Sequence, residues 1–380
     1  MTQRVQALDA LRGLAIFAML LVNNPGSWQH VYAPLLHASW HGLTPTDLVF
    51  PGFIFVMGVT IAIQFPKAVA TSSGRAALCL SALRRSAVLV LLGWLLYLFW
   101  FDFSVPQYSW LDSRLATLRY FGVLQRLGLV YFLTIVVLCV VAARGILYSA
   151  IALLIFYWLI MSFMPYQTAT GEQFQGLWLH GNSLAAYVDN QLFGAQHLYY
   201  AKARPFAFDP EGLLSTMPAV SSCLLGVVAG RHALVANGCS SRLLNIALAG
   251  ICIGAAMSAW VPVNKALWTP TFVLITSGIM VYLLWGLMLL ERRFQLFKPG
   301  NPLLVAGTNS IALYMLAGIL ARLLLMVRIN GESLKHWLYQ PITQVISSPE
   351  LASLCFALLF CGVCYLPLRW MYRRGIFWRV

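Results

Sequence analysis

The sequence predicts an all-α, polytopic membrane protein. Of its 380 residues, 60% are apolar and only 9% are charged, and the mean hydropathy is +0.77. Soluble domains carry about 25% charged residues, and no soluble fold of this length could bury such an apolar excess. Aromatic residues make up 13% of the chain and include 13 Trp, which is typical of the belts at the two membrane surfaces. The composition excludes secreted disulfide scaffolds, nucleic-acid-binding proteins and disordered chains.

Ten apolar segments have the length, about 17–25 residues, that a helix needs to cross a bilayer. We expect these spans near residues 7–24, 46–65, 84–103, 121–141, 145–164, 212–232, 243–261, 270–290, 303–323 and 350–371. The longest polar stretch, about residues 165–211, falls between the fifth and sixth spans. The sequence contains no internal repeat and no low-complexity linker. We therefore expect one transmembrane domain over residues 1–380.

Local signals support several of these spans. No small-x-small cleavage pattern follows residue 22 and Asp9 precedes the first span, so we expect an uncleaved helix rather than a signal peptide. Pro51 and Gly52 are expected to loosen the first turns of the second span. Pro270 occupies a first-turn position of the eighth span, where proline is favoured.

The basic residues predict the orientation of the chain, because cytoplasmic loops retain Lys and Arg. If the N-terminus is cytoplasmic, the inside loops hold about twice as many of the 25 Lys and Arg residues as the outside loops, and Arg126 falls within a span. We therefore expect both termini in the cytoplasm. None of the eight cysteines falls in a predicted outside loop, so no disulfide is expected. Cys361 and Cys364 lie in an apolar helix, where a packing role is favoured over redox or zinc chemistry.

The outside segment near residues 24–45 contains no Lys or Arg but holds three of the seven histidines, His30, His37 and His41. Asp47 follows at the start of the second span. Ionisable groups at membrane depth are costly and are therefore functional candidates. A neutral His37 could take up a proton near neutral pH, with Asp47 orienting its ring. The alternative is an interfacial histidine that is hydrogen-bonded to a backbone carbonyl.

A metal site is a weaker interpretation of the same segment. His37 and His41 are four residues apart, which on a helix would place both on one face. Gly42 and Pro45 argue against a regular helix there, and the spacing suggests no third ligand. We therefore expect no metal.

Further polar side chains near the span ends are candidates for the site. The amide of Asn23 could stabilise an oxyanion or could simply cap a helix. Asp209 and Glu211 could bind a cationic amine, although carboxylates are also favoured at helix N-termini by the helix dipole. The full set of candidate substrate ligands is Trp40, His41, Asp209, Glu211, Asn264, Lys265, Trp268 and Asn309.

Six segments resemble the heparan-alpha-glucosaminide N-acetyltransferase family, in particular its shorter bacterial, NagX-like members. They occur in family order from residue 4 to about residue 316. They are ALDALRGLAI with LLVN, HASWHGLTPTDLVFPGFIFVMG, RYFGVLQRLGLVY, FDPEGLLSTMPA, VNKALWTPTFVL and GTNSIALYML.

The resemblance implies that an acetyl group passes from cytosolic acetyl-CoA to the amine of a glucosamine on the opposite side of a membrane. By motif, His37 matches the active-site histidine, Asn23 a nearby essential asparagine, and Asp47 the aspartate that begins the DLVFP helix. His41 departs from the human-type pattern, which has Asn there. Basic residues are candidate ligands of the CoA phosphates, or else residues that only set topology: Arg75, Arg84, Arg85 and Arg126.

We expect a multi-pass N-acetyltransferase of the bacterial inner membrane, with acetyl-CoA as cosubstrate and periplasmic glucosamine or a small glucosaminide as acceptor. A homodimer is compatible with the resemblance. The alternatives are an amino-sugar transporter, which helix breaks and midplane polar groups would also suit, and an O-acyltransferase of an envelope glycan. The sequence leaves open whether His37 is itself acetylated or acts as a base in a ternary complex, which we favour.

Overall fold

A computed structural model of the chain describes residues 6–71, 74–235 and 240–378. Three of the basic and cysteine residues counted in the sequence, Arg4, Cys239 and Arg379, lie outside these ranges. Helices dominate the described residues, and the strands in them form three two-stranded hairpins, β1–β2, β3–β4 and β5–β6. The predicted all-α class is confirmed.

Eight helices among the described residues are long and apolar enough to span a membrane, so the polytopic architecture is confirmed. They are α1 (Gln6–Asn23), α2 (Val49–Thr71), α3 (Arg75–Leu98), α4 (Val123–Val140), α5 (Gly145–Phe163), α7 (Leu213–Val235), α9 (Pro270–Phe294) and α13 (Pro349–Arg373). A bent pair, α10 (Pro302–Thr308) and α11 (Ser310–Met326), adds a ninth candidate if it is counted as one span. The remaining predicted span is the 17-residue α8 (Ser241–Met257).

Two predicted spans differ from the structure in informative ways. The third helix begins at Arg75 rather than near residue 84, so Arg84 and Arg85 lie within α3 and not at its cytoplasmic end. The ninth is broken between α10 and α11, whose axes meet at 89°. Asn309 stands at this break with φ −126° and ψ 39°, outside the helical region.

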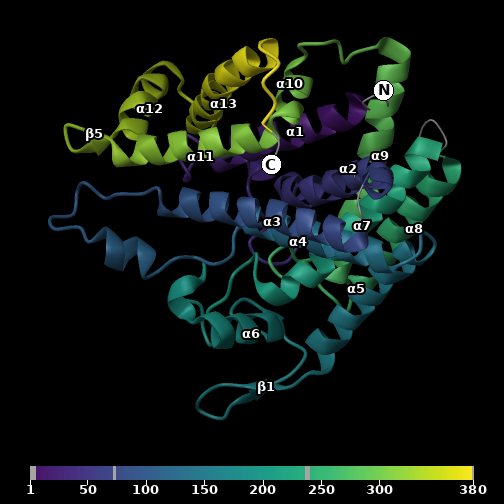
Figure 1. Cartoon of the computed structure of the whole chain (residues 1–380). Helices are drawn as coiled ribbons and strands as arrows, with labels where there is room; N and C mark the ends of the chain where they lie inside the picture. The colour runs from purple at the N-terminus through teal and green to yellow at the C-terminus, as the bar shows by residue number, and fades with distance from the viewer. Residues whose placement is uncertain (1–5, 72–73, 236–239, 379–380) are drawn as a thin grey trace.

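The connections between spans also carry short elements. The segment between α5 and α7 contains β1 (Tyr166–Gln167), β2 (Gln173–Phe174), β3 (Trp178–Leu179), β4 (Asn182–Ser183) and α6 (Leu184–Phe193), and it projects from the helical bundle at the bottom of Figure 1. The segment between α11 and α13 contains β5 (Arg328–Ile329), β6 (Glu332–Ser333) and α12 (Leu334–Val345). Short 3₁₀ turns, η1 (Ala33–Leu35) and η2 (Pro45–Leu48), lead from α1 into α2.

Glycines set the closest helix crossings. A Cβ on Gly58 of α2 would lie 2.0 Å from the carbonyl oxygen of Cys223 on α7, and a Cβ on Gly13 of α1 would lie 1.9 Å from that of Leu303 on α10. Small residues at such positions let helix backbones approach closely, which is how helices associate where lipid removes the hydrophobic driving force. These two crossings fix the helices that line the site described below.

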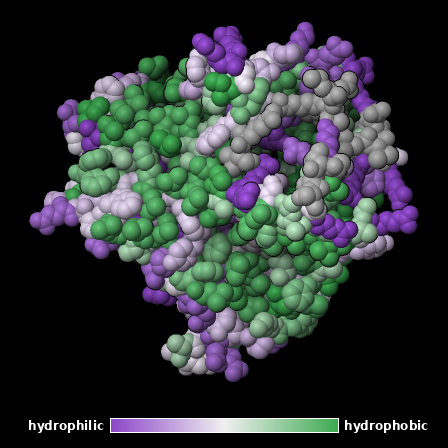
Figure 2. Space-filling model, viewed as in Figure 1, coloured by the Kyte–Doolittle hydropathy of each residue, from purple (hydrophilic) through white to green (hydrophobic). Residues whose placement is uncertain are grey.

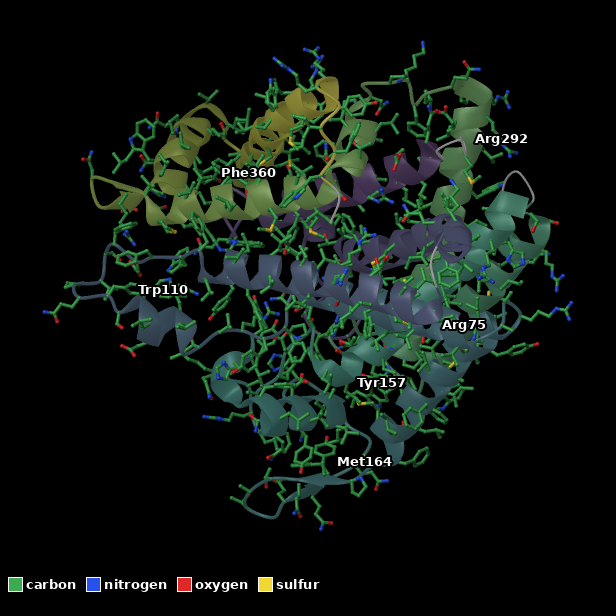
Figure 3. All side chains as sticks on the ribbon, in the orientation of Figure 1. Arg75, Trp110, Tyr157, Met164, Arg292 and Phe360 are labelled. Atoms are coloured by element: carbon green, nitrogen blue, oxygen red, sulfur yellow. The ribbon has the colours of Figure 1, made fainter. Side chains whose placement is uncertain are left out.

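The surface agrees with a membrane setting. Figure 2 shows a broad hydrophobic area on the face in view. Large apolar side chains on the candidate spans are also exposed, among them Leu95, Ile155 and Leu359. In Figure 3, Arg75 at the start of α3 and Arg292 near the end of α9 lie on one side of the molecule, and Trp110 lies on the opposite side. The two arginines thus share one side of the molecule, which the predicted orientation assigns to the cytoplasm.

Candidate active site

A cavity of about 370 Å³ opens where the C-terminal end of α1 meets the N-terminal ends of α2, α4 and α9. We call it the outer cavity, because these helix ends form the predicted outer side. It brings together seven of the residues that the sequence singled out: Asn23, His37, Trp40, Asp47, Glu211, Lys265 and Trp268. Four further lining residues were missed, and they come from three separate segments: Arg119, Tyr199, Tyr200 and Tyr314.

His37 and Asp47 form a defined pair on the wall of this cavity. His37 Nδ1 donates to Asp47 Oδ1 over 2.7 Å, because a carboxylate only accepts. The other oxygen, Asp47 Oδ2, accepts from the backbone N–H groups of Ala38 and Thr44. Asp47 is 1% exposed, whereas 46% of the His37 side chain is exposed. With Nδ1 protonated, His37 Nε2 is left as an acceptor facing the cavity.

The sequence around Asp47 explains why its carboxylate is so well fixed. Thr44 precedes Pro45 at the start of η2, and Thr44 and Asp47 form a capping box across that turn. Thr44 Oγ1 also lies 3.0 Å from Asp47 Oδ2. Oδ2 of the carboxylate therefore caps the start of η2, while Oδ1 holds the tautomer of His37.

Lys265 lies against the imidazole ring of His37. Its Nζ atom is 3.1 Å from Nδ1 and 3.4 Å from Nε2 of His37, and 3.5 Å from Asp47 Oδ1. Burial lowers the pKa of Lys265, and the carboxylates of Asp47 and Glu211 offset part of this effect. The site thus holds an ammonium group whose proton is easier to release than that of an exposed lysine.

Asn23 is the last residue of α1, and its side chain is exposed to the outer cavity. Within the described part of the chain, no hydrogen bond to its amide is present. The neighbouring Asn24 amide, in contrast, donates to the carbonyl oxygen of Leu20. The amide of Asn23 is therefore available to a ligand.

Arg119 organises two carboxylates beside the cavity. Its Nε and Nη2 atoms donate to the two oxygens of Asp209 over 2.7 Å each, and Nη2 also donates to Glu211 Oε2 over 2.5 Å. Burial would raise the pKa of Glu211, but the charges of Arg119, Arg126 and Lys265 outweigh it and lower that pKa. Glu211 is thus an anion on the cavity wall, and Asp209 lies behind it and outside the lining.

The segment that carries Glu211 is held in place by hydrogen bonds to Asp189 of α6. Asp189 accepts hydrogen bonds from the backbone N–H groups of Asp209 and Leu213. A Cβ on Gly212 would lie 1.9 Å from Asp189 Oδ2, so only glycine allows this approach. Burial raises the pKa of Asp189 to about 7.

Besides Asp209, three predicted substrate ligands lie outside the outer cavity, and so does the predicted CoA ligand Arg126. Asn264 is fully buried, and its amide donates to the carbonyl oxygen of Trp40 and lies 3.3 Å from Nδ1 of His41, so it supports the histidine loop. His41 itself does not line the cavity, and burial lowers its pKa. Arg126 is fully buried, donates to Gly212 and Ser215, and lies over the Trp268 ring at 5.2 Å. Asn309 lies at the opposite side of the bundle, at the α10–α11 break.

A second, larger cavity of about 730 Å³ occupies the predicted cytoplasmic half. We call it the inner cavity. Arg85 lines it together with two cations that the sequence analysis did not select, Arg12 and Lys67, whereas Arg75 and Arg84 do not. Arg12 also donates to Asp9 over 3.2 Å and to Thr60 over 2.6 Å.

The two cavities are separated by one layer of side chains. On α2, Phe50 lines the outer cavity and Phe53 the inner one. On α11, Tyr314 lines the outer cavity and Ile311 the inner one. Since an α-helix rises about 1.5 Å per residue, three residues correspond to roughly 4.5 Å. Along both helices, the linings of the two cavities are therefore less than one helical turn apart.

Among the residues that the structure describes, no three His, Cys, Asp or Glu side chains gather in a way that could hold a metal ion. The chemistry available at the site is that of an imidazole, an ammonium, carboxylates and an amide. This set suits proton transfer and the stabilisation of a developing oxyanion.

Comparisons with known proteins identify the family. The family model "Heparan-alpha-glucosaminide N-acetyltransferase, catalytic" matches residues 4–238. The heparan-alpha-glucosaminide N-acetyltransferase of Homo sapiens is 28% identical over 357 aligned positions, which cover 82% of this chain and 52% of that protein. That of Mus musculus is 29% identical and is covered to 53%. The chain spans about half the length of these relatives. It belongs to the heparan-alpha-glucosaminide N-acetyltransferase family.

Proposed function

We propose that this membrane-embedded N-acetyltransferase moves the acetyl group of acetyl-CoA, bound in the inner cavity, to the amine of glucosamine or a small glucosaminide in the outer cavity. The observation that carries the proposal is the pair of cavities whose linings are less than one helical turn apart, with cations around one and an imidazole–carboxylate pair on the other. In this proposal the membrane is a bacterial inner membrane and the acceptor is periplasmic.

The inner cavity supplies what a CoA ester needs. Arg12, Lys67 and Arg85 place three cations on its wall, where they would bind the phosphates of the cosubstrate. Guanidinium groups bind phosphate oxygens in a bidentate way, which lysine cannot do. With the phosphates held there, the thioester at the end of the pantetheine arm would reach the side-chain layer between the cavities.

The outer cavity supplies what an amine acceptor needs. An amino sugar is largely protonated at neutral pH, and the anionic Glu211 would hold its ammonium group. The ammonium would first release one proton to water, and His37 Nε2 would then take up the second proton, which the amine nitrogen loses as it attacks. Asp47 would keep Nδ1 protonated and so keep Nε2 basic.

We propose direct transfer in a ternary complex. The lone pair of the amine forms the new C–N bond at the acetyl carbonyl carbon, and the negative charge on the resulting oxyanion is stabilised by the amide of Asn23. The C–S bond then breaks, and the proton held by His37 passes to the departing CoA thiolate. The products are an N-acetyl sugar and CoA, with no acetyl-enzyme.

Thiol release from acetyl-CoA by purified protein in detergent tests the proposal. We expect release that depends on glucosamine, an amide product, and loss of both in His37→Ala. His336→Ala is a matched control, because His336 is exposed on α12 and its ring lies 3.0 Å from the side-chain amide of Gln340. Uptake of labelled glucosamine into vesicles without acetyl-CoA would instead indicate a transporter, and an ester product would indicate an O-acyltransferase.

A stable acetyl-imidazole on His37, trapped with acetyl-CoA alone, would contradict direct transfer while leaving the acetyltransferase activity in place. Mass spectrometry of the intact protein would detect this acetyl group, and His37→Ala serves as the control that cannot carry it. Dimer formation is a separate expectation, which sedimentation in detergent would test.

A further inference from the structure

The buried amide of Asn309 holds a segment that follows α13. Asn309 Nδ2 donates to the carbonyl oxygen of Ile376 over 3.0 Å, and Trp378 N donates to Asn309 Oδ1 over 2.8 Å. Asn309 is 1% exposed. A single side chain therefore satisfies the backbone groups on both sides of Phe377.

This clamp places two aromatic rings on the wall of the inner cavity. Phe377 and Trp378 both line it, and they remain 37% and 41% exposed. Phe377 has one distant ring neighbour, Tyr372, with centroids 6.0 Å apart in an edge arrangement. The described part of the chain shows no ring contact for Trp378. Their faces are thus available to a planar ligand group.

The cavity combines these rings with cations. Arg12, Lys67 and Arg85 line the same space, and Arg85 lies over the ring of Tyr131 at 4.7 Å. Aromatic faces next to cations form a site for a purine joined to phosphates, because bases stack on aromatic rings and phosphates bind guanidinium groups.

We propose that Phe377 and Trp378, positioned by Asn309, form the platform on which the adenine ring of acetyl-CoA stacks. The proposal rests on the proposed function and deepens it: it assigns the adenine end of the donor to the segment after α13 and the phosphates to the cations. Asn309 acts as a positioning residue, since it holds the backbone of the platform and does not itself touch the ligand.

The test compares two donors in Trp378→Ala. Acetyl-CoA carries the adenosine, whereas S-acetyl-4′-phosphopantetheine keeps the thioester and one phosphate but lacks it. Loss of a base-stacking ring weakens binding by roughly five- to 100-fold. We therefore expect kcat/KM for acetyl-CoA to fall by roughly that factor through KM, and kcat/KM for the truncated donor to stay within about twofold of wild type.

Two further variants separate stacking from structure. Trp378→Phe keeps an aromatic face and should recover most of the affinity for acetyl-CoA. Trp370→Ala removes an exposed tryptophan of α13 that does not line the cavity, and it should behave as wild type. Asn309→Ala should raise KM for acetyl-CoA and spare the truncated donor in the same way as Trp378→Ala.

The outcomes are decisive in either direction. Equal losses for both donors, or no loss in Trp378→Ala, would overturn the platform and leave the acetyltransferase intact. If wild type transfers no acetyl group from either donor, the proposed function fails, and binding of adenosine 3′,5′-bisphosphate still tests the platform. Quenching of tryptophan fluorescence by this nucleotide in wild type, reduced at least fivefold in apparent affinity in Trp378→Ala, would support it, and no quenching would refute it.

Discussion

Replacing Asp47 with Asn tests how the site sets the protonation of His37. The amide has the shape of the carboxylate but can accept on one side only. If its oxygen faces Ala38 and Thr44, two backbone N–H bonds survive; if it faces His37, only the bond to Nδ1 survives. Because each buried donor left without a partner costs about 1–3 kcal/mol, the first orientation is favoured by roughly that amount.

In that orientation the amide N–H points at His37 Nδ1, which must then accept. The proton moves to Nε2, and the atom that faces the cavity is no longer a base. The equivalent change in a Ser-His-Asp triad lowers kcat by about 10⁴-fold. We expect a fall of about 10³- to 10⁴-fold in Asp47→Asn, which corresponds to roughly 4–5.5 kcal/mol of transition-state stabilisation.

The assay is glucosamine-dependent thiol release from acetyl-CoA, measured with the melting temperature of the same preparation. Asp102→Asn is the matched control, because Asp102 is an exposed carboxylate that accepts from Ser104 in the α3–α4 connection. A folded Asp47→Asn protein that kept more than about a tenth of the wild-type kcat would refute the assignment of Nε2 as the base.

Four further predictions concern other parts of the molecule. Glu211→Gln should raise KM for the amine about tenfold or more with a smaller change in kcat, because a charge-assisted hydrogen bond is lost; equal changes in both constants would contradict this role. Arg85→Met should raise KM for acetyl-CoA and reduce its dependence on salt, measured from 50 to 300 mM. Gly58→Ala should lower the melting temperature, because overpacking costs about 1–3 kcal/mol, while Gly286→Ala, with open space around it, should not. In the folded protein the pKa of Asp189 is about 7, so between pH 4 and 7 the folded protein keeps a proton that the unfolded chain loses. The free energy of unfolding should therefore fall as the pH rises through this range. In Asp189→Asn this pH dependence should be weaker.

The sequence sufficed for the fold class and for the core of the outer site. Both depend on local information: apolar segments of spanning length, and a histidine ten residues before an aspartate at a helix entry. It did not suffice for Arg119, whose partners Asp209 and Glu211 lie 90 and 92 residues further along the chain. No periodicity in one sequence reveals such a pairing, because any cation in an outside loop has the same local pattern.

The cations of the inner cavity were difficult to select for a different reason. Arginines near the cytoplasmic ends of spans set topology and can also bind phosphates, and composition does not distinguish the two roles. Helix α3 also begins at Arg75, before the apolar segment that predicted the third span. Arg85 was therefore expected at the end of a span, whereas it lies within the helix and lines the inner cavity. Asn309 was predicted to be a substrate ligand, because an amide inside a span needs a hydrogen-bond partner. In the structure its partner is instead the backbone of a segment 67–69 residues further along the chain.

The division of charge between the two cavities favours transfer without an acetyl-enzyme. The donor's phosphates would stay with Arg12, Lys67 and Arg85, and the acceptor's ammonium would stay with Glu211, so neither charge crosses the layer that contains Phe50 and Phe53. A charge in the membrane interior costs at least a few kcal/mol. The acetyl thioester is neutral, and the linings of the two cavities are less than one helical turn apart. In a direct route, the neutral acetyl thioester is therefore the only group that enters the layer between the cavities. An acetylated His37 would add a step that the geometry does not require.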